Sequence, residues 1–354
     1  MAAAARIGFA DTIGGRMKQR RLGRTGLVVS EICLGTMTFG NQADEATSRA
    51  VLDRAYEAGV DFLDIAEVYP VPPDVRYAGR SEEFVGRWMA DKPRDGLLIA
   101  TKVAGPGSGW FVAAVRANHT SLDRHHITRA VEGSLRRLGT DYIDLYQTHW
   151  PDRGVPLEET MEALTSLIEA GKVRYVGCSN ETAYGLTKSL WVSERNGLAR
   201  YETIQNNFSL LNRRFEDELA EVCRRESVSL LPYSPLAGGV LSGKYENDAR
   251  PAGARFTLYE KGSPRGQTMT RRFVNEGTLS STARFARIAR ETGMSVSTLA
   301  IAWSLAHDFV GSTIIGATTP EQLTDTLAAA DVKLPSDVLA ACNEVSREIR
   351  YPMG

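Results

Sequence analysis

The strongest constraint on the fold is a pattern that recurs along the whole chain. A short apolar run is followed by a loop and then by an amphipathic stretch of helical length. Alternating strands and helices predict parallel strands joined by helical crossovers, because a parallel connection must carry the chain back to the edge where it started. About eight strands are expected, at Ile32–Leu34, Phe62–Ile65, Leu97–Lys102, Tyr142–Tyr146, Val173–Cys178, Thr203–Gln205, Ser229–Pro232 and Thr313–Ile315.

The segments between these runs carry the signals of helices. Val131, Leu135 and Leu138 recur at helical spacing, and Pro156 and Gly171 are typical start and stop signals around another segment. Helices are expected at Glu45–Ala58, Ser81–Met89, Thr128–Leu138, Pro156–Ala170, Glu216–Glu226, Ser281–Thr292, Val296–Ala306, Pro320–Ala329 and Ser336–Ile349. The stretch Asp248–Gln267, rich in Gly, Pro and Arg, is expected to be a long loop.

An open doubly wound sheet and a closed barrel both fit this alternation. The dinucleotide fingerprint of the open fold is missing, because GTMTFG at Gly35–Gly40 has the wrong spacing. About eight units without a second domain's worth of sequence favour a single (β/α)8 barrel over residues 17–354. The segment Gln19–Ser30 predicts a small hairpin ahead of the barrel, and residues 1–16 are expected to be a disordered extension.

The charge balance and the cysteine pattern exclude several classes of function. The 354 residues include 42 Lys+Arg and 43 Asp+Glu, and a net charge of −1 is not suited to binding a phosphate backbone. No apolar run approaches the roughly 20 residues that cross a bilayer. The four cysteines are far apart, which argues against a disulfide framework or a metal site and suits a reducing cytoplasm. They are Cys33, Cys178, Cys223 and Cys342.

Polar residues close nearly every predicted strand, and in a barrel such residues meet at one rim. Asp64 ends the second strand with Tyr69 just after it, Lys102 ends the third, and His149 follows the fourth. Because a Lys⁺ beside a Tyr hydroxyl favours the phenolate, Lys102 is expected to lower the pKa of Tyr69 from about 10. Such a tyrosine can donate a proton to a developing alkoxide. Alternatively, Asp64 and Lys102 form only a structural ion pair.

Six segments, in order, resemble the aldo-keto reductases, and the resemblance spans residues 18–345. GTMTFG and AEVYPVPP are most similar to the bacterial Tas-like branch, which is related to the potassium-channel β subunits. The resemblance implies a barrel whose floor is closed by the N-terminal hairpin. The segments are DFLDIAEVY (Asp61–Tyr69), IATKV (Ile99–Val103), DYIDLYQTHWPD (Asp141–Asp152), GKVRYVGCSN (Gly171–Asn180), YSPLAGGVLSGKY (Tyr233–Tyr245) and IIGATTPEQL (Ile314–Leu323).

The resemblance also implies a catalytic set and a cofactor, NADP(H). Tyr69 would be the acid/base, Asp64 and Lys102 its tuning pair, and His149 the group that orients the substrate. Lys244 and Arg255 would supply positive charge for a 2′-phosphate. The implied cofactor residues are Gly35, Thr36, Met37, Asp64, Ser179, Asn180, Gln205, Tyr233, Ser234, Pro235, Leu236, Gly238, Lys244, Arg255, Gly316, Thr318, Gln322 and Asp325.

The substrate side is expected to involve Tyr69, His149, Trp110 and Trp150. Trp110 lies in the long segment Ala104–Asp123, which either lines a substrate pocket or packs on the barrel as a surface flap. The family reduces an aldehyde or ketone to the alcohol by hydride transfer from the nicotinamide. The alternative is a regulatory subunit of the channel-β type that senses the nucleotide. The channel subunits carry an asparagine where this chain has His149, so the reductase is favoured. The carbonyl substrate and the oligomeric state stay open.

Overall fold

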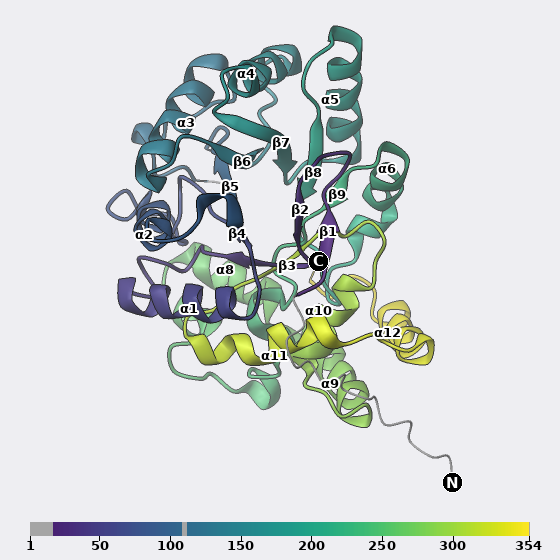
Figure 1. Cartoon of the computed structure of the whole chain (residues 1–354). Helices are drawn as coiled ribbons and strands as arrows, with labels where there is room; N and C mark the ends of the chain where they lie inside the picture. Colours follow the sequence, from purple (N-terminus) through teal and green to yellow (C-terminus); the bar gives the residue numbers. More distant parts are fainter. Residues whose placement is uncertain (1–16, 108–111, 354) are drawn as a thin grey trace.

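The computed structural model describes residues 17–107 and 112–353, and its centre is a closed sheet of parallel strands (Figure 1). Each strand pairs with its neighbour in the order β10-β3-β4-β5-β6-β7-β8-β9. Backbone hydrogen bonds close the ring, with Ile314 N donating to Pro232 O at 3.0 Å. The strands are β3 (Ile32–Gly35), β4 (Phe62–Asp64), β5 (Leu98–Val103), β6 (Ile143–Thr148), β7 (Val173–Ser179), β8 (Tyr201–Gln205), β9 (Ser229–Leu230) and β10 (Thr313–Ile315). The predicted (β/α)8 barrel is confirmed.

The predicted hairpin is also confirmed, as β1 (Gln19–Arg21) paired antiparallel with β2 (Val28–Ser30). Leu22 and Leu27, in the hairpin turn, are fully buried and share a core cluster with Phe62 and Leu145 from inside the barrel. The apolar turn therefore closes the end of the barrel at which the strands begin. Burial of the two leucine side chains, which is worth about 25 cal/mol per Å² of apolar surface, stabilises the hairpin against the end of the barrel.

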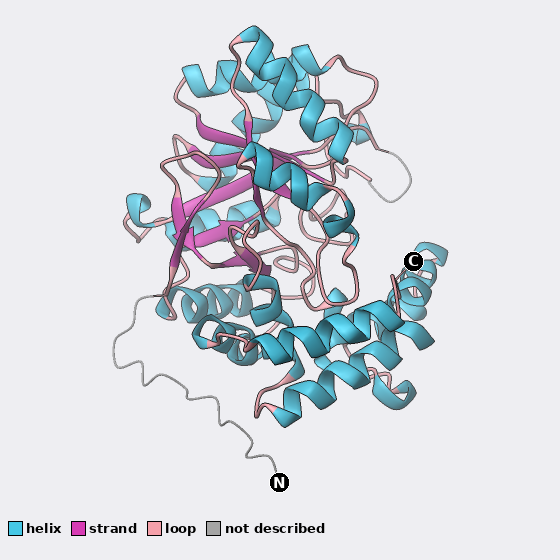
Figure 2. Ribbon diagram, turned by 90° about the vertical axis from the view of Figure 1, so that its right-hand side faces the viewer, coloured by secondary structure: helices cyan, strands magenta, loops and turns pink. Residues whose placement is uncertain are grey.

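Helices surround the sheet (Figure 2), and each predicted helix corresponds to helical structure. Side-chain caps set several starts, since Asp44 accepts from Thr47 N and Asp123 accepts from His126 N. The helices are α1 (Glu45–Glu57), α2 (Arg80–Met89), α3 (Arg124–Leu138), α4 (Leu157–Glu169), α5 (Ala183–Asn196), α6 (Leu219–Glu226), α7 (Arg255–Glu260), α8 (Pro264–Phe273), α9 (Glu276–Glu291), α10 (Val296–Leu305), α11 (Leu323–Leu327) and α12 (Ser336–Glu348). None of the helices in the described part of the chain is long and apolar enough to cross a membrane.

Three expectations about helices were wrong. The stretch Asp248–Gln267 is not simply a loop, because α7 and the first part of α8 lie within it, and Ser263 caps α8 ahead of Pro264. The predictions omitted α5, which Thr182 caps at its start. The predicted helix Pro320–Ala329 is divided into α11 with a 3-10 turn on either side.

The two ends of the described chain lie at different places on the barrel. Met17 is buried beside Gly59, which precedes β4, and therefore lies at the hairpin end. Met353 is also buried, and its carbonyl accepts a hydrogen bond from Arg272 Nε at 3.3 Å. Asn275 Nδ2 donates to the carbonyl of Pro352 at 3.1 Å, so the last residues are fixed to the end of α8 and the start of α9.

Candidate active site

A polar layer lies inside the barrel above an apolar one, because side chains alternate along each strand. Three adjacent strands each contribute one apolar residue to the core cluster that also contains the hairpin leucines. Two positions further along each strand, the inward side chain is polar. The pairs are Phe62 and Asp64 on β4, Ala100 and Lys102 on β5, and Leu145 and Gln147 on β6. The alternation therefore delivers the polar groups to the open end of the barrel.

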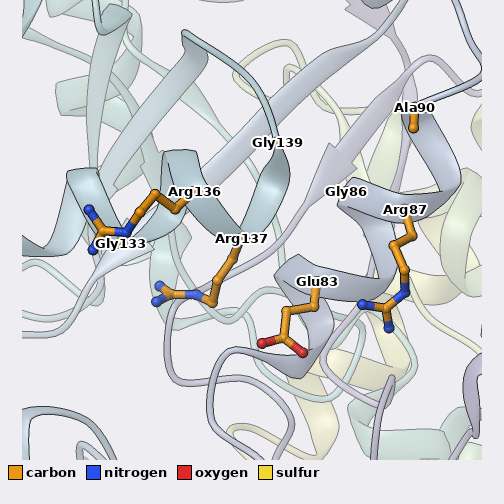
Figure 3. Close-up of a pocket in the computed structure, with 8 residues that line it drawn as sticks. All are labelled: Glu83, Gly86, Arg87, Ala90, Gly133, Arg136, Arg137 and Gly139. Carbon is orange, nitrogen blue, oxygen red and sulfur yellow. The ribbon is translucent and has the colours of Figure 1, made fainter.

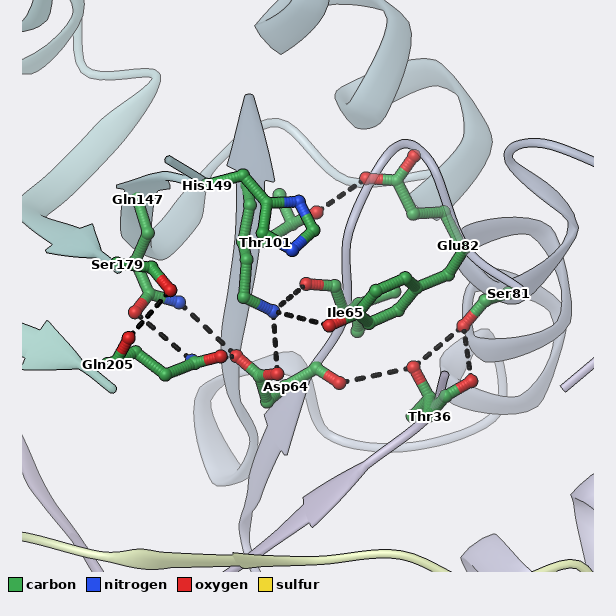
Figure 4. Close-up of polar contacts among 12 residues, drawn as sticks. Thr36, Asp64, Ile65, Ser81, Glu82, Thr101, Gln147, His149, Ser179 and Gln205 are labelled. Carbon is green, nitrogen blue, oxygen red and sulfur yellow. Dashed lines mark hydrogen bonds and ion pairs between the residues drawn. The ribbon is translucent and has the colours of Figure 1, made fainter. Parts of the chain in front are cut away.

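The Lys102 ammonium group is the centre of this layer and is fully buried. Its Nζ donates to Asp64 Oδ2 at 2.6 Å, to the carbonyl of Ile65 at 2.7 Å and to the Tyr69 hydroxyl at 3.3 Å (Figure 4). All three donors of the ammonium are thus used. Burial acts to lower the pKa of Lys102, but Asp64 and Tyr69 outweigh burial and raise it, so the group is charged at neutral pH.

Two amide side chains hold the second oxygen of Asp64. Gln205 Nε2 donates to Asp64 Oδ1 at 2.7 Å, and Gln147 Nε2 donates to the same oxygen at 3.2 Å (Figure 4). Gln147 was not among the predicted site residues. Its position two residues before His149, on a strand of period two, was the signal that could have identified it.

The expected net lowering of the Tyr69 pKa was wrong. Tyr69 is 8% exposed, and burial raises its pKa above the ordinary value, whereas the Lys102 charge lowers it only part of the way. Excluding water from a phenol penalises the phenolate, and the sequence shows the neighbouring charge but not this exclusion. Tyr69 is therefore a neutral phenol in contact with a cation, which is the form that can donate a proton.

His149 lies beside this phenol, with ring centroids 5.7 Å apart in an edge arrangement. Burial, and then the charge of Lys102, hold the pKa of His149 well below its ordinary range, so the imidazole is neutral. Its Nδ1 is buried without a hydrogen-bond partner among the described residues. The structure thus brings Asp64, Tyr69, Lys102 and His149 together, while their catalytic roles stay predictions.

The predicted nicotinamide residues form a connected group next to His149. Asn180 Nδ2 donates to the carbonyl of His149 at 2.9 Å, and the Tyr233 hydroxyl donates to Asn180 Oδ1 at 2.8 Å. Ser179 Oγ donates to the carbonyl of Gln205 at 2.7 Å (Figure 4). Polar groups from β7 and β8 therefore converge with the catalytic candidates at the same end of the barrel.

The segment after Tyr233 forms a curved loop with two cations. Ser234, Ala237, Gly238 and Gly239 all have positive φ, between 48° and 99°, and the Ala237 and Gly239 N–H groups donate to carbonyls within the turn, which fixes its shape. Gly239 has a φ of 99°, a backbone conformation that residues with a Cβ rarely adopt, so glycine is favoured there. The remaining predicted members, Pro235 and Leu236, lie in this same turn.

Lys244 and Arg255 form a cationic pair near this loop. Burial, and then the charge of Arg255, lower the pKa of Lys244. Among the described residues, neither cation has a carboxylate within ion-pair distance, whereas Arg250, which lies between them in the chain, pairs with Glu260 at 2.8 Å. Two cations that repel each other without an acidic partner fit a bound anion.

The other predicted cofactor residues lie at the ends of β3 and β10. A Cβ on Gly35 would lie 2.8 Å from Ile314, and Thr38 Oγ1 donates to the carbonyl of Ala317 at 2.8 Å, so the two strand ends are in contact. The side chain of Thr36 bonds Ser81 and the Asp64 carbonyl (Figure 4), and its backbone N–H donates to the same carbonyl at 3.0 Å, so Thr36 serves the fold. The others near here are Met37, Gly316, Thr318, Gln322 and Asp325.

Of the predicted substrate residues, Trp150 is buried and belongs to a small apolar cluster with Tyr69. Its Nε1 donates to the carbonyl of Pro106 at 2.8 Å. Trp110 lies outside the described residues. A separate groove of about 460 Å³ lies between α2 and α3 and is lined partly by Glu83, Arg87 and Arg137 (Figure 3), away from the strand ends that carry the polar layer.

Comparison with known proteins identifies the family to which the chain belongs. The model of the aldo/keto reductase family matches residues 31–347, and the chain belongs to this family of oxidoreductases, whose members generally use NAD(P)H. Protein tas of Escherichia coli (strain K12) is 42% identical over 354 residues, covering 95% of this chain and 99% of that protein.

Two further relatives are named for different functions. The uncharacterized oxidoreductase YrpG of Bacillus subtilis (strain 168) is 35% identical over 333 residues, covering 93% of this chain and 96% of YrpG. A probable voltage-gated potassium channel subunit beta of Oryza sativa subsp. japonica is 35% identical over 320 residues, covering 89% and 92%. Similarity alone thus spans two functional classes.

Replacing Lys102 tests how the buried charges are balanced. Lys102→Met leaves the Asp64 carboxylate buried without its cation, so the free energy of unfolding is expected to fall by about 3–5 kcal/mol. The double variant Asp64→Asn/Lys102→Met removes both charges and is expected to recover most of this loss, as measured by urea denaturation. Arg224→Met, which breaks an exposed pair with Asp308, is the control. A double variant no more stable than Lys102→Met would contradict the prediction.

Proposed function

We propose that the protein is an NADP(H)-dependent oxidoreductase that reduces an aldehyde or ketone to the alcohol. The observation that carries the proposal is a neutral Tyr69 phenol whose hydroxyl is 3.3 Å from a charged, fully buried ammonium group. A proton donor of this kind, next to a neutral imidazole, suits a carbonyl that gains negative charge on its oxygen.

The described residues also fit a dinucleotide phosphate. The Gly239 backbone lies against the end of the Lys244 side chain at a φ of 99°, which favours glycine, and Lys244 and Arg255 have no carboxylate partners among the described residues. When bound, the reduced nicotinamide supplies the hydride. Ser179, Asn180 and Gln205 would hold its carboxamide, and Tyr233 would contact the ring.

The chain's own groups account for the proton. Tyr69 donates its hydroxyl proton to the carbonyl oxygen as the carbonyl carbon accepts the hydride, which gives the alcohol and a phenolate. Lys102 Nζ already contacts the Tyr69 hydroxyl oxygen, and its positive charge stabilises the phenolate. Asp64, in turn, keeps the ammonium charged and in place. The neutral His149 would orient the carbonyl by hydrogen bonding rather than by charge.

The second candidate is a regulatory subunit that binds the nucleotide and turns over slowly. The 35% identity to the rice channel subunit supports it. The neutral histidine at position 149 supports the enzyme instead, because an imidazole next to the phenol is placed to contact a carbonyl oxygen. A wild-type rate with aldehydes in the ordinary enzymatic range, about 1 s⁻¹ or more, would decide for the reductase.

We also propose that residues 17–354 act as one domain in the cytoplasm, with a small-molecule carbonyl compound of open identity as substrate. Four free, buried thiols fit a reducing compartment. Continuous core packing links the helices on every side of the barrel, which supports one domain.

The variant Tyr69→Phe tests the proton donor. Removing the hydroxyl leaves the ring in place, so NADPH affinity is expected to stay unchanged while kcat for aldehyde reduction falls by about 10²–10⁴-fold. NADPH consumption gives kcat, and quenching of protein fluorescence gives the dissociation constant. Tyr77→Phe, on a nearby surface turn, is the control. A Tyr69→Phe variant with the wild-type rate would remove Tyr69 from the mechanism.

The pH dependence of reduction follows from the two shifted groups. Reduction needs protonated Tyr69, and because its pKa is raised above 10, this form is lost only as the pH rises beyond about 10. The pKa of His149 is lowered well below 6.5, so His149 stays neutral at and above that pH. We expect kcat/KM for the aldehyde to be flat from about pH 6.5 to 10. A falling limb centred near pH 8 would show that the titrating group is a different one.

Lys244 and Arg255 test the cofactor preference. In Lys244→Met/Arg255→Gln, loss of charge-assisted contacts to a 2′-phosphate is expected to raise KM for NADPH about 10–100-fold. KM for NADH, which lacks that phosphate, is expected to change much less. Arg250→Gln is the matched control, because Arg250 lies in the same region but is paired with Glu260 at 2.8 Å. Equal changes for both cofactors would show that the two cations do not contact the 2′-phosphate.

A further inference from the structure

The ring of Tyr69 lies in a small apolar cluster built from separate segments of the chain. The turn after β4 contributes Ala66 and Val68, and the loop after β5 contributes Ala104 and Ala113, with Val115 packed against them. Trp150 completes the buried part. The part of this cluster that comes from the loop after β5, Ala104 with Ala113–Val115, is named here the loop wall.

One buried carboxylate joins the loop wall to the turn that carries Tyr69. Glu67, two residues before Tyr69, is 1% exposed. Its Oε1 accepts from the Ala104 amide at 2.7 Å and from Arg116 Nη2 at 2.8 Å, and its Oε2 accepts from Arg116 Nη1 at 2.5 Å. Glu67 therefore binds the loop at two places, one at the end of β5 and one twelve positions later in the chain.

The backbone at Arg116 is strained in a way that this ion pair offsets. Arg116, Ala117 and Asn118 have φ values of 49°, 54° and 63°, a region that residues with a Cβ rarely adopt. Strained residues of this kind persist only where surrounding contacts over-determine them, and they concentrate at functional sites. The two-point contact with Glu67 is such a restraint, because a guanidinium fork fixes both distance and orientation.

A second buried ion pair, Arg137 with Glu82, provides a comparison for the pair of Arg116 and Glu67. Arg137 pairs with Glu82, which is fully buried and also accepts from Thr101 Oγ1 at 2.7 Å. That pair joins α3 to α2 and does not belong to the cluster around Tyr69. The pair of Arg116 and Glu67 differs because it acts on residues in contact with the proposed proton donor.

We propose that Arg116 is a positioning residue for the reaction. Through Glu67 it holds the loop wall against Tyr69, and the wall sets the affinity for carbonyl compounds that carry a large apolar group. This inference rests on the proposed function for its kinetic part. Contacts to the wall are the same in the bound substrate and the transition state, so they change KM rather than kcat. Because the single positive charge of Arg116 is paired with the Glu67 carboxylate, the described part of the wall offers no free cation to an anionic substrate.

The test compares Arg116→Lys with its matched control Arg137→Lys. Each variant keeps the charge and loses the fork, so folding is preserved in both. With 2-naphthaldehyde, Arg116→Lys is expected to raise KM about tenfold with kcat within about twofold. With propanal, which carries no large apolar group, both constants are expected to match wild type. Arg137→Lys is expected to match wild type with both aldehydes.

Hydrogen exchange gives a measurement that needs no turnover. The Ala104 amide donates to Glu67, and in Arg116→Lys its exchange is expected to quicken about tenfold, while Arg137→Lys leaves it unchanged. In Glu67→Gln/Arg116→Met no buried charge is left unpaired, so this variant is expected to fold and to show the same rise in KM for 2-naphthaldehyde.

The outcomes separate the two proposals. If wild type reduces neither aldehyde, the proposed function fails, and exchange at Ala104 still decides whether Arg116 holds the wall. Unchanged exchange in Arg116→Lys overturns the inference. An equal rise in KM for both aldehydes, or the same rise in Arg137→Lys, overturns it as well, because either result indicates a general effect on the fold.

Discussion

The buried ammonium group of Lys102 is the interaction on which the rest of the site depends. A charge removed from water is tolerated only where an opposite charge and hydrogen-bond acceptors surround it. Adjacent strands supply these groups, because β4 and β5 pair in a register that brings Asp64 next to Ala100 and so to the level of Lys102. The third acceptor is the Tyr69 hydroxyl. The buried ammonium group needs a third hydrogen-bond acceptor, and this need places the Tyr69 phenol beside Lys102.

Much of this arrangement follows from local sequence patterns. Alternating runs predicted the strands, and the polar residue at the end of each run predicted the members of the site, because strand period and barrel symmetry bring such positions to one rim. The same rule applied consistently would have included Gln147. The predicted helix boundaries were less accurate where the start signal was indirect. Thr182 and Ser263 are ordinary caps, but the buried faces of their helices include polar residues, such as Ser189 and Ser193 in α5 and Thr270 in α8.

Other features depend on contacts that a local pattern does not contain. The net effect on the Tyr69 pKa depends on how completely water is excluded, which is set by segments distant in the chain, such as the one carrying Trp150. The pairing of Glu67 with Arg116 joins residues 49 positions apart. Likewise, the net charge of −1 gives no sign that Lys244 and Arg255 lie together without acidic partners among the described residues. Sequence spacing identified the chemical groups, while their protonation and pairing needed the fold.

The closed floor of the barrel has a practical consequence for handling the protein. Leu22 and Leu27 close the end opposite the polar layer, and Met17 lies at that same end. The C-terminal residues are instead anchored beside Arg272, whose charge acts on Tyr233. A tag or fusion partner attached ahead of Met17 therefore leaves the end of the barrel that carries the candidate site open to solvent. The same attachment after Met353 lies close to that end and obstructs access to it.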